Sequence, residues 1–159
     1  MEDKLFSTLD PVTRSLILPN GRQCLLTDTV GFIHKLPPSI VAAFRATLEE
    51  LAEADLLLHV VDITHHDAAE QFQTVEEILA DLNLTEKPQI TILNKIDLVV
   101  KNPEELATLA LTKSIKPPPG DGTVTISALK GWGLDKLLSK IAAHLSQSLD
   151  TASTHNRVD

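Results

Sequence analysis

Two short motifs in the sequence carry side chains suited to binding a nucleotide. In Asp28-Thr29-Val30-Gly31, the carboxylate can hold Mg²⁺ through a water molecule, and the glycine lets its backbone N–H approach a phosphate because it has no Cβ. In Asn94-Lys95-Ile96-Asp97, the Asp97 carboxylate can accept hydrogen bonds from N1 and N2 of guanine, a pair of donors that adenine lacks. Asn94 would brace this loop, and the stem of Lys95 would cover the base.

A third motif, Ser127-Ala128, offers a backbone N–H for the guanine carbonyl. Taken singly, each motif also fits a plainer interpretation: a turn at a strand end for the first, a polar loop for the second, and an ordinary loop for the third. Each one, however, follows a predicted strand, and open α/β sheets bind ligands at the carboxyl ends of their strands. We therefore expect all three motifs at one edge of a sheet.

The elements that position these motifs are apolar runs alternating with helical patterns, which is typical of an α/β domain with a mostly parallel sheet. At the start, Asn20-Gly21 between two short apolar runs predicts an antiparallel hairpin. The predicted strands are 13–18, 23–27, 56–62, 89–93 and 123–126, and the predicted helices are 39–54, 68–82, 103–111 and 134–149. We expect one domain over residues 1–149 and a disordered tail over 150–159.

Two aromatic side chains receive structural interpretations. The strand 56–62 is continuously apolar and is expected to be buried on both faces, so His59 within it is predicted to be a hydrogen-bonded core histidine. Trp132 stands between two glycines and is predicted to cover the last helix.

Composition excludes several classes of protein. With 159 residues, 43% hydrophobic and 23% charged, the chain fits one folded domain. Its net charge of −8 leaves no overall basic field for free DNA. No apolar run approaches the roughly 20 residues of a membrane span. A single cysteine, Cys24, and an N-terminus without an apolar signal core predict a cytoplasmic location.

The order and separation of the three motifs resemble the G3, G4 and G5 elements of a Ras-like GTPase. More specifically, Asp28 to Asp62 resembles the switch II region, helix and next strand of the HflX family of ribosome-associated GTPases, and Leu5 to Arg14 is similar to its switch I region. The resemblance covers roughly residues 4–146. It implies a Ras-like G domain of the P-loop NTPase type, with GTP or GDP and Mg²⁺ as ligands and the large ribosomal subunit as partner.

The resemblance also implies roles for individual residues. Thr8 would stand at the threonine that closes over Mg²⁺ and the terminal phosphate, and Asp28 would hold the same ion through water. Gly31 would contact the phosphate. The guanine-binding residues would be Asn94, Lys95, Asp97, Ser127 and Ala128.

The sequence departs from the family pattern at three places. It contains no G-x-x-x-x-G-K-[ST] phosphate loop, so the first strand and this loop are absent from the expected sheet. Leu129 stands where this class usually has lysine. Phe32 stands where Ras-type enzymes have the glutamine that orients water, which implies a family that hydrolyses GTP with another group in that role and with stimulation by the ribosome. No catalytic residue is assigned.

Three interpretations therefore remain open. The chain is most of the G domain of an HflX-like GTPase, with hydrolysis expected of the full-length family member and not of this chain alone. Alternatively, it is a non-enzymatic interaction module that keeps the G-domain fold without nucleotide turnover. Or it is a fragmentary gene product whose full-length form is the active GTPase, which the coding sequence upstream of Met1 would reveal.

Overall fold

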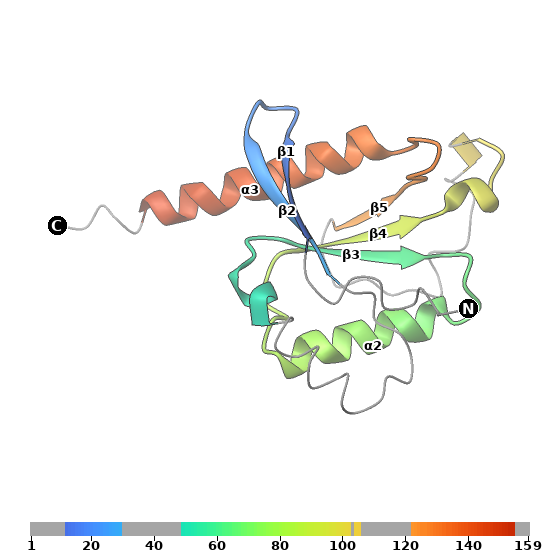
Figure 1. Cartoon of the computed structure of the whole chain (residues 1–159), viewed down its shortest axis with the longest axis horizontal. Helices are drawn as coiled ribbons and strands as arrows, with labels where there is room; N and C mark the ends of the chain where they lie inside the picture. The colour runs from blue at the N-terminus through green and yellow to red at the C-terminus, as the bar shows by residue number, and fades with distance from the viewer. Residues whose placement is uncertain (1–11, 30–48, 103, 106–121, 155–159) are drawn as a thin grey trace.

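A computed structural model describes residues 12–29, 49–102, 104–105 and 122–154 of the chain (Figure 1). The strands are β1 (Val12–Ile17), β2 (Gln23–Asp28), β3 (Leu57–Asp62), β4 (Gln89–Asn94) and β5 (Thr123–Thr125). The helices are α2 (Ala68–Asp81) and α3 (Leu134–Thr154), with short 3-10 turns η2 (Glu49–Glu53) and η3 (Ile96–Leu98).

The central layer is a parallel sheet in the order β3-β4-β5. β3 pairs with β4 from Leu57↔Gln89 to Asp62↔Asn94, so both strands end at the same level. β4 lies in the middle and is buried on both faces: Ile90 and Ile92 are 0% and 2% exposed on one face, and Thr91 and Leu93 are 1% and 2% exposed on the other. The mostly parallel sheet predicted from the alternating pattern is thus confirmed for the described strands.

Helices cover both faces of this sheet (Figure 1). On one face, Ala68 and Phe72 of α2 form a buried cluster with Val61 and Leu93. On the other face, α3 and the sheet form a larger cluster that contains Ile90, Ile92, Val124, Ile126, Leu137, Ile141 and Ala142. The 3.6-residue spacing of the apolar positions in each helix places them on the side that faces the sheet.

The N-terminal hairpin forms a second, two-stranded sheet. β1 and β2 pair antiparallel, and Gly21 adopts a φ of +79° in the turn between them. This confirms the hairpin that Asn20-Gly21 predicts. Leu18, 2% exposed, belongs to the α3-side cluster and anchors the hairpin to the rest of the domain.

The hairpin sheet and the parallel sheet do not pair with each other. Among the described strands, β2 pairs only with β1, and β3 only with β4. Val60 in β3 is 58% exposed, so the prediction that this strand is buried on both faces was wrong at this residue. Val60 lies on the opposite face from Val61, and the α3-side cluster on that face includes Leu58 but does not extend to Val60.

The remaining differences concern the ends of helices. α3 continues to Thr154 instead of ending near residue 149, because residues 150–154 contain neither glycine nor proline to stop it; the expected tail therefore begins as helix. The predicted helix 39–54 is a 3-10 turn over Glu49–Glu53, and its earlier part lies outside the described residues. Nearly all of the predicted helix 103–111 also lies outside the described residues.

In the described part of the chain, no helix is both long and apolar enough to span a membrane.

Candidate functional site

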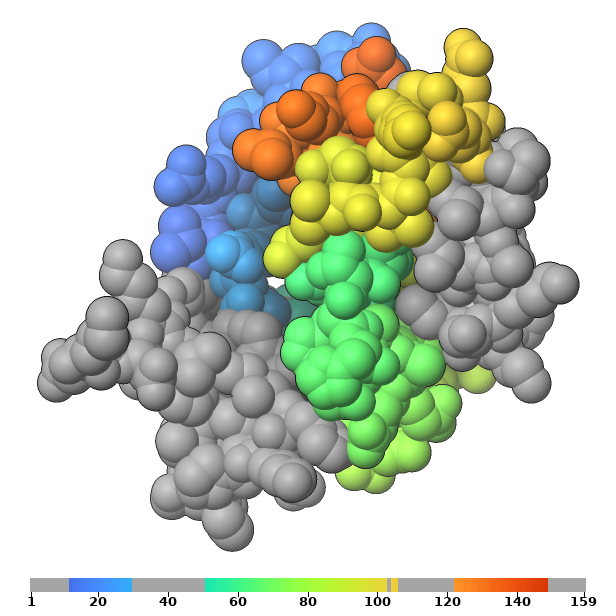
Figure 2. All heavy atoms as spheres, turned by 90° about the vertical axis from the view of Figure 1, so that its right-hand side faces the viewer, coloured from blue at the N-terminus to red at the C-terminus, as the bar shows by residue number. Residues whose placement is uncertain are grey.

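The loops that follow β4 and β5 meet at the carboxyl edge of the parallel sheet, the edge that faces the viewer in Figure 2. The backbone continues the pairing beyond the strands: Ile126 donates to the carbonyl of Leu93 at 2.8 Å, and Ile96 donates to the carbonyl of Ile126 at 3.3 Å. The two loops are therefore held together by main-chain bonds. These bonds bring the N-K-x-D and Ser-Ala motifs side by side, as the strand pattern predicts.

Lys95 makes the turn that starts the first loop. It adopts the left-handed conformation, with φ 69° and ψ 30°, which is uncommon for a residue with a Cβ. The chain then enters η3, and Ile96 is fully buried beneath it. This turn and its buried anchor set the direction of Asp97, the next residue.

Asp97 is oriented by Ser127 from the second loop. The Ser127 hydroxyl donates to Oδ1 of Asp97 at 2.7 Å, and the Ser127 side chain has no exposed surface. The same hydroxyl oxygen accepts the backbone N–H of Lys130 at 3.1 Å. Because this hydroxyl donates to Asp97 and accepts from the backbone of Lys130, the position of the Asp97 carboxylate is tied to the backbone of the second loop.

Asn94 braces the two loops against each other. Its Oδ1 accepts the backbone N–H of Ala128 at 3.1 Å, which agrees with the bracing role expected for this side chain. The backbone N–H of Ser127 instead donates to the carbonyl of Trp132 at 3.0 Å. Both N–H groups of the Ser-Ala motif thus donate hydrogen bonds within the protein, and that of Ala128 belongs to an exposed residue.

The second loop closes on itself between Ser127 and Trp132, whose backbones exchange two hydrogen bonds at 3.0 and 3.1 Å. Glycines flank the tryptophan at φ +76° and φ +74°. At Gly133, a Cβ would overlap the carbonyl oxygen of Thr125, so a side chain there would push the loop away from the sheet. This geometry fixes the backbone position of Trp132.

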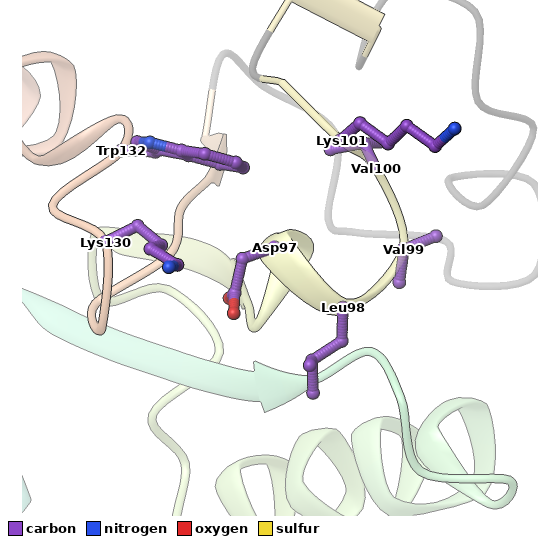
Figure 3. A pocket seen from close by; sticks show the side chains of 7 residues that line it. All are labelled: Asp97, Leu98, Val99, Val100, Lys101, Lys130 and Trp132. Atoms are coloured by element: carbon purple, nitrogen blue, oxygen red, sulfur yellow. The ribbon is translucent and has the colours of Figure 1, made fainter.

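An open pocket of about 550 Å³ lies between the two loops (Figure 3). Asp97 and residues 98–101 line it from the first loop, and Lys130 and Trp132 line it from the second. Its volume is within the range of small-molecule sites. Trp132, expected to cover the last helix, thus contributes to the wall of the pocket beside Asp97. Leu129, at the position that usually carries lysine, is 84% exposed and is not part of the lining.

A third loop, after β3, contacts the site through Asp62. Oδ2 of Asp62 pairs with the ammonium of Lys95 at 2.7 Å, and Oδ1 accepts the backbone N–H and the hydroxyl of Thr64 at 3.0 and 2.6 Å. Burial acts to raise the pKa of Asp62, but the hydrogen bonds from Lys95 and Thr64 and the attraction of the Lys95 charge outweigh it and lower the pKa below its ordinary value. The carboxylate is therefore ionised at neutral pH.

The structure gathers the predicted base-reading residues and separates them from the phosphate motif. Asn94, Lys95, Asp97, Ser127 and Ala128 lie in adjoining loops of the parallel sheet, whereas Asp28 ends a strand of the separate hairpin. The expectation of one shared sheet edge therefore fails for Asp28, because β2 has no described strand linking it to β3. Thr8, Gly31 and Phe32 lie outside the described residues.

Three contributors to the site, Asp62, Thr64 and Trp132, were not assigned to it from the sequence. Asp62 and Thr64 close a turn after β3, and the signal that would have found them is a carboxylate at the end of the strand that neighbours the N-K-x-D strand. Trp132 was placed elsewhere because a tryptophan between glycines does not by itself indicate which surface its ring covers.

Comparisons with known proteins decide which family this arrangement belongs to. The sequence profile of the family described as 50S ribosome-binding GTPase matches residues 1–95. The chain belongs to this family. The predicted Ras-like α/β fold and the resemblance to the HflX GTPases are confirmed by this match and by the relatives that follow.

Among the similar proteins are two GTPases named HflX. That of Caldanaerobacter subterraneus is 46% identical over 153 residues, which is 96% of this chain and 32% of the relative. That of Chlamydia pneumoniae is 49% identical over 140 residues, 87% of this chain and 28% of the relative. This member of the family thus spans about a third of the length of these relatives.

A solved structure shows the same fold. It is the crystal structure of a GTP-binding protein from Sulfolobus solfataricus in complex with GDP, with a TM-score of 0.71 and 34% identity. The match covers 86% of this chain and 45% of the other.

Proposed function

We propose that this chain supplies the guanine-recognising part of a GTP- and GDP-binding site. The observation that carries the proposal is the Asp97 carboxylate held at 2.7 Å by the fully buried Ser127 beside an open pocket. One oxygen of this carboxylate bonds Ser127. The remaining lone pairs of the two oxygens are available as acceptors, so the carboxylate can also accept hydrogen bonds from N1–H and N2–H of guanine.

Discrimination follows from the hydrogen-bonding pattern of the base. Adenine lacks donors at the positions of guanine N1–H and N2–H, so its binding would leave the oriented carboxylate unsatisfied. The Ala128 N–H, shared with Asn94, is the proposed donor to the guanine carbonyl. The stem of Lys95 is proposed to cover the face of the base.

Residues at or near the N-terminal hairpin are proposed to bind the phosphates and their Mg²⁺. Asp28 is an exposed carboxylate at the end of β2, and a carboxylate oxygen is the donor type that Mg²⁺ prefers, so this residue fits the ion that guanine nucleotides bring with them. Thr8 would bind the same ion and Gly31 the terminal phosphate. Bound Mg²⁺ would supply neutralisation of phosphate charge.

The wider role is proposed from the family. Similarity to proteins described as ribosome-binding GTPases supports GTP hydrolysis as the activity of full-length family members, the large ribosomal subunit as partner and a cytoplasmic location. The relatives named GTPases do not favour the interaction-module alternative. Phe32 stands where Ras-type enzymes have the glutamine that orients the attacking water, so we assign no residue of this chain to that role.

The test is to titrate the chain with nucleotides and to monitor binding by NMR. Trp132 is the only tryptophan in the sequence, so its indole N–H gives a single signal from the pocket wall. We expect GDP to shift this signal at lower concentrations than ADP. Asp97→Asn should abolish the response to GDP and produce a response to XDP, because the amide can donate to the second carbonyl of xanthine.

Asp81→Asn is the matched control, since it makes the same change in an exposed residue at the far end of α2. It should titrate like the wild type. Equal responses to GDP and ADP in the wild type, or an unchanged response to GDP in Asp97→Asn, would contradict the assignment of the base site.

A further inference from the structure

We propose that Asp62 is a positioning residue for the base site: it holds Lys95 across the carboxyl edge so that the lysine stem forms a fixed wall beside the base. The inference rests on the proposed guanine site and adds a residue to it. Neither the D-x-x-G, the N-K-x-D nor the Ser-Ala motif contains Asp62. Asp62 begins the loop after β3, and its contacts link this loop to Lys95.

The strand register places Asp62 where it can reach Lys95. Asp62 is the register partner of Asn94, the last residue of β4, and Lys95 follows immediately. The left-handed turn at Lys95 changes the direction of the chain, and its ammonium meets Oδ2 of Asp62 at 2.7 Å. The contact thus spans the two neighbouring strands at the point where both end.

The carboxylate is itself held in place. Its other oxygen, Oδ1, accepts both the backbone N–H and the hydroxyl of Thr64, at 3.0 and 2.6 Å. The two oxygens therefore have separate roles: Oδ1 fixes the group to its own loop, and Oδ2 faces the lysine. A carboxylate anchored in this way presents a defined position to Lys95 rather than a mobile charge.

Positioning is a better account of this pair than stability. The Lys95 and Asp62 side chains are 50% and 33% exposed, and ion pairs at such exposure contribute little to folding. A free lysine stem, in contrast, loses rotational freedom about several bonds when a ligand binds, and this loss of entropy weakens binding. Holding the ammonium beforehand reduces the loss, so the effect of Asp62 should be seen in affinity.

The design of the test uses the separate roles of the two oxygens. Asp62→Asn retains an oxygen for the bonds from Thr64 and removes the negative charge that faces Lys95. Lys95→Met removes the ammonium and keeps a stem of similar length. Asp81→Asn, which changes an exposed residue at the other end of the sheet, is the control for the loss of one charge.

The measurement is titration of each variant with GDP, IDP and ADP, read from the Trp132 indole signal, together with urea unfolding. We expect Asp62→Asn to weaken GDP and IDP binding by the same factor, about 3- to 10-fold, with the unfolding midpoint unchanged. The ratio of GDP to IDP affinity should stay constant because the lysine stem contacts the ring face and not the edge that Asp97 reads. In a Lys95→Met background, Asp62→Asn should have no further effect.

Equal GDP affinity in Asp62→Asn and Asp81→Asn would overturn this inference. It would also be overturned if Asp62→Asn weakened GDP binding as much in the Lys95→Met background as in the wild type. A change in the unfolding midpoint that accounts for the lost affinity would assign Asp62 a structural role instead. Failure of the proposed function is distinct, because it would appear as equal responses to GDP and ADP in the wild-type chain.

Discussion

Ser127 and Asp97 lie thirty residues apart in the sequence and are joined by a hydrogen bond of 2.7 Å between the serine hydroxyl and Oδ1 of the aspartate. The serine has no exposed surface, while the aspartate lies at the edge of an open pocket. A buried group thus orients a group that is accessible to a ligand. The backbone pairing between the ends of β4 and β5 makes this contact possible.

Ser127→Ala tests this relationship. The substitution removes the donor to Asp97 and the acceptor for the Lys130 N–H, so we expect the free energy of unfolding to fall by about 1–3 kcal/mol. We also expect a smaller GDP-to-ADP affinity ratio, because the carboxylate loses its fixed orientation. Urea unfolding and nucleotide titration measure the two effects. Ser139→Ala, at an exposed position of α3, should change neither, and a wild-type ratio in Ser127→Ala would contradict the orienting role.

Affinity for phosphates gives a second prediction. The 159-residue sequence contains no G-x-x-x-x-G-K-[ST] loop, and each charge-assisted hydrogen bond of such a loop contributes about 1.5–3 kcal/mol. Since about 1.4 kcal/mol is a tenfold change in affinity, we expect this chain by itself to bind GTP with a Kd in the millimolar range. Calorimetry with GTP and Mg²⁺ measures it, and a Kd near 1 μM would show that other residues hold the phosphates.

The meeting of the two motifs that we propose to read the base was predictable from the sequence because it is local. Asn94-Lys95-Ile96-Asp97 and Ser127-Ala128 directly follow buried strands, and parallel pairing of those strands brings them together without further information. The bond between Ser127 and Asp97 and the pairing of Asp62 with Lys95 depend on side-chain directions after the strands end. Those directions are set by the left-handed turn at Lys95, which sequence spacing does not encode.

The larger arrangement was only partly predictable. Apolar spacing located α2 and the strands to within one or two residues, since burial decides where these elements lie. It does not by itself indicate which strand neighbours which, but the resemblance to a Ras-like G domain does: the absent first strand belongs between β2 and β3, and these two strands are indeed unpaired with each other.

The edge of β3 that pairs with no described strand gives a third prediction. Val60 is 58% exposed on a strand that pairs only with β4 among the described strands, and unpaired apolar edges promote association with another chain. We expect the protein to self-associate, as measured by light scattering, and to unfold at a Tm below about 60 °C. Val60→Lys should reduce the association and change the free energy of unfolding by no more than about 0.5 kcal/mol, because the side chain is already exposed.

Leu129→Lys is the control for Val60→Lys, since Leu129 is an even more exposed apolar residue and lies in a loop. It should leave association unchanged. A wild-type protein that is monomeric and unfolds cooperatively above about 60 °C would show that the edge of β3 is protected in solution.

The contact between His59 and Glu76 gives the last prediction, on pH. Nδ1 of His59 in β3 lies 3.2 Å from Oε1 of Glu76 in α2, an oxygen that also accepts from Gln89, and the imidazole stacks on Phe72 with the ring centroids 4.8 Å apart. His59 was predicted to be a hydrogen-bonded core histidine, and this is confirmed. Burial lowers the pKa of His59 below its ordinary value of 6.5, although the hydrogen bond and the charge of Glu76 act in the opposite direction.

A histidine whose pKa is lower in the folded state binds its proton more readily in the unfolded state. The unfolded state therefore gains protons first as the pH falls below 6.5, and the free energy of unfolding should decrease between pH 7.5 and pH 5.5. His59→Gln retains a donor for Glu76 and does not titrate, so this variant should lose less stability over the same interval. Urea unfolding at the two pH values measures the difference, with His144→Gln on α3 as the matched control. If His59→Gln and the wild type lost equal stability, the pH dependence would have to come from groups other than His59.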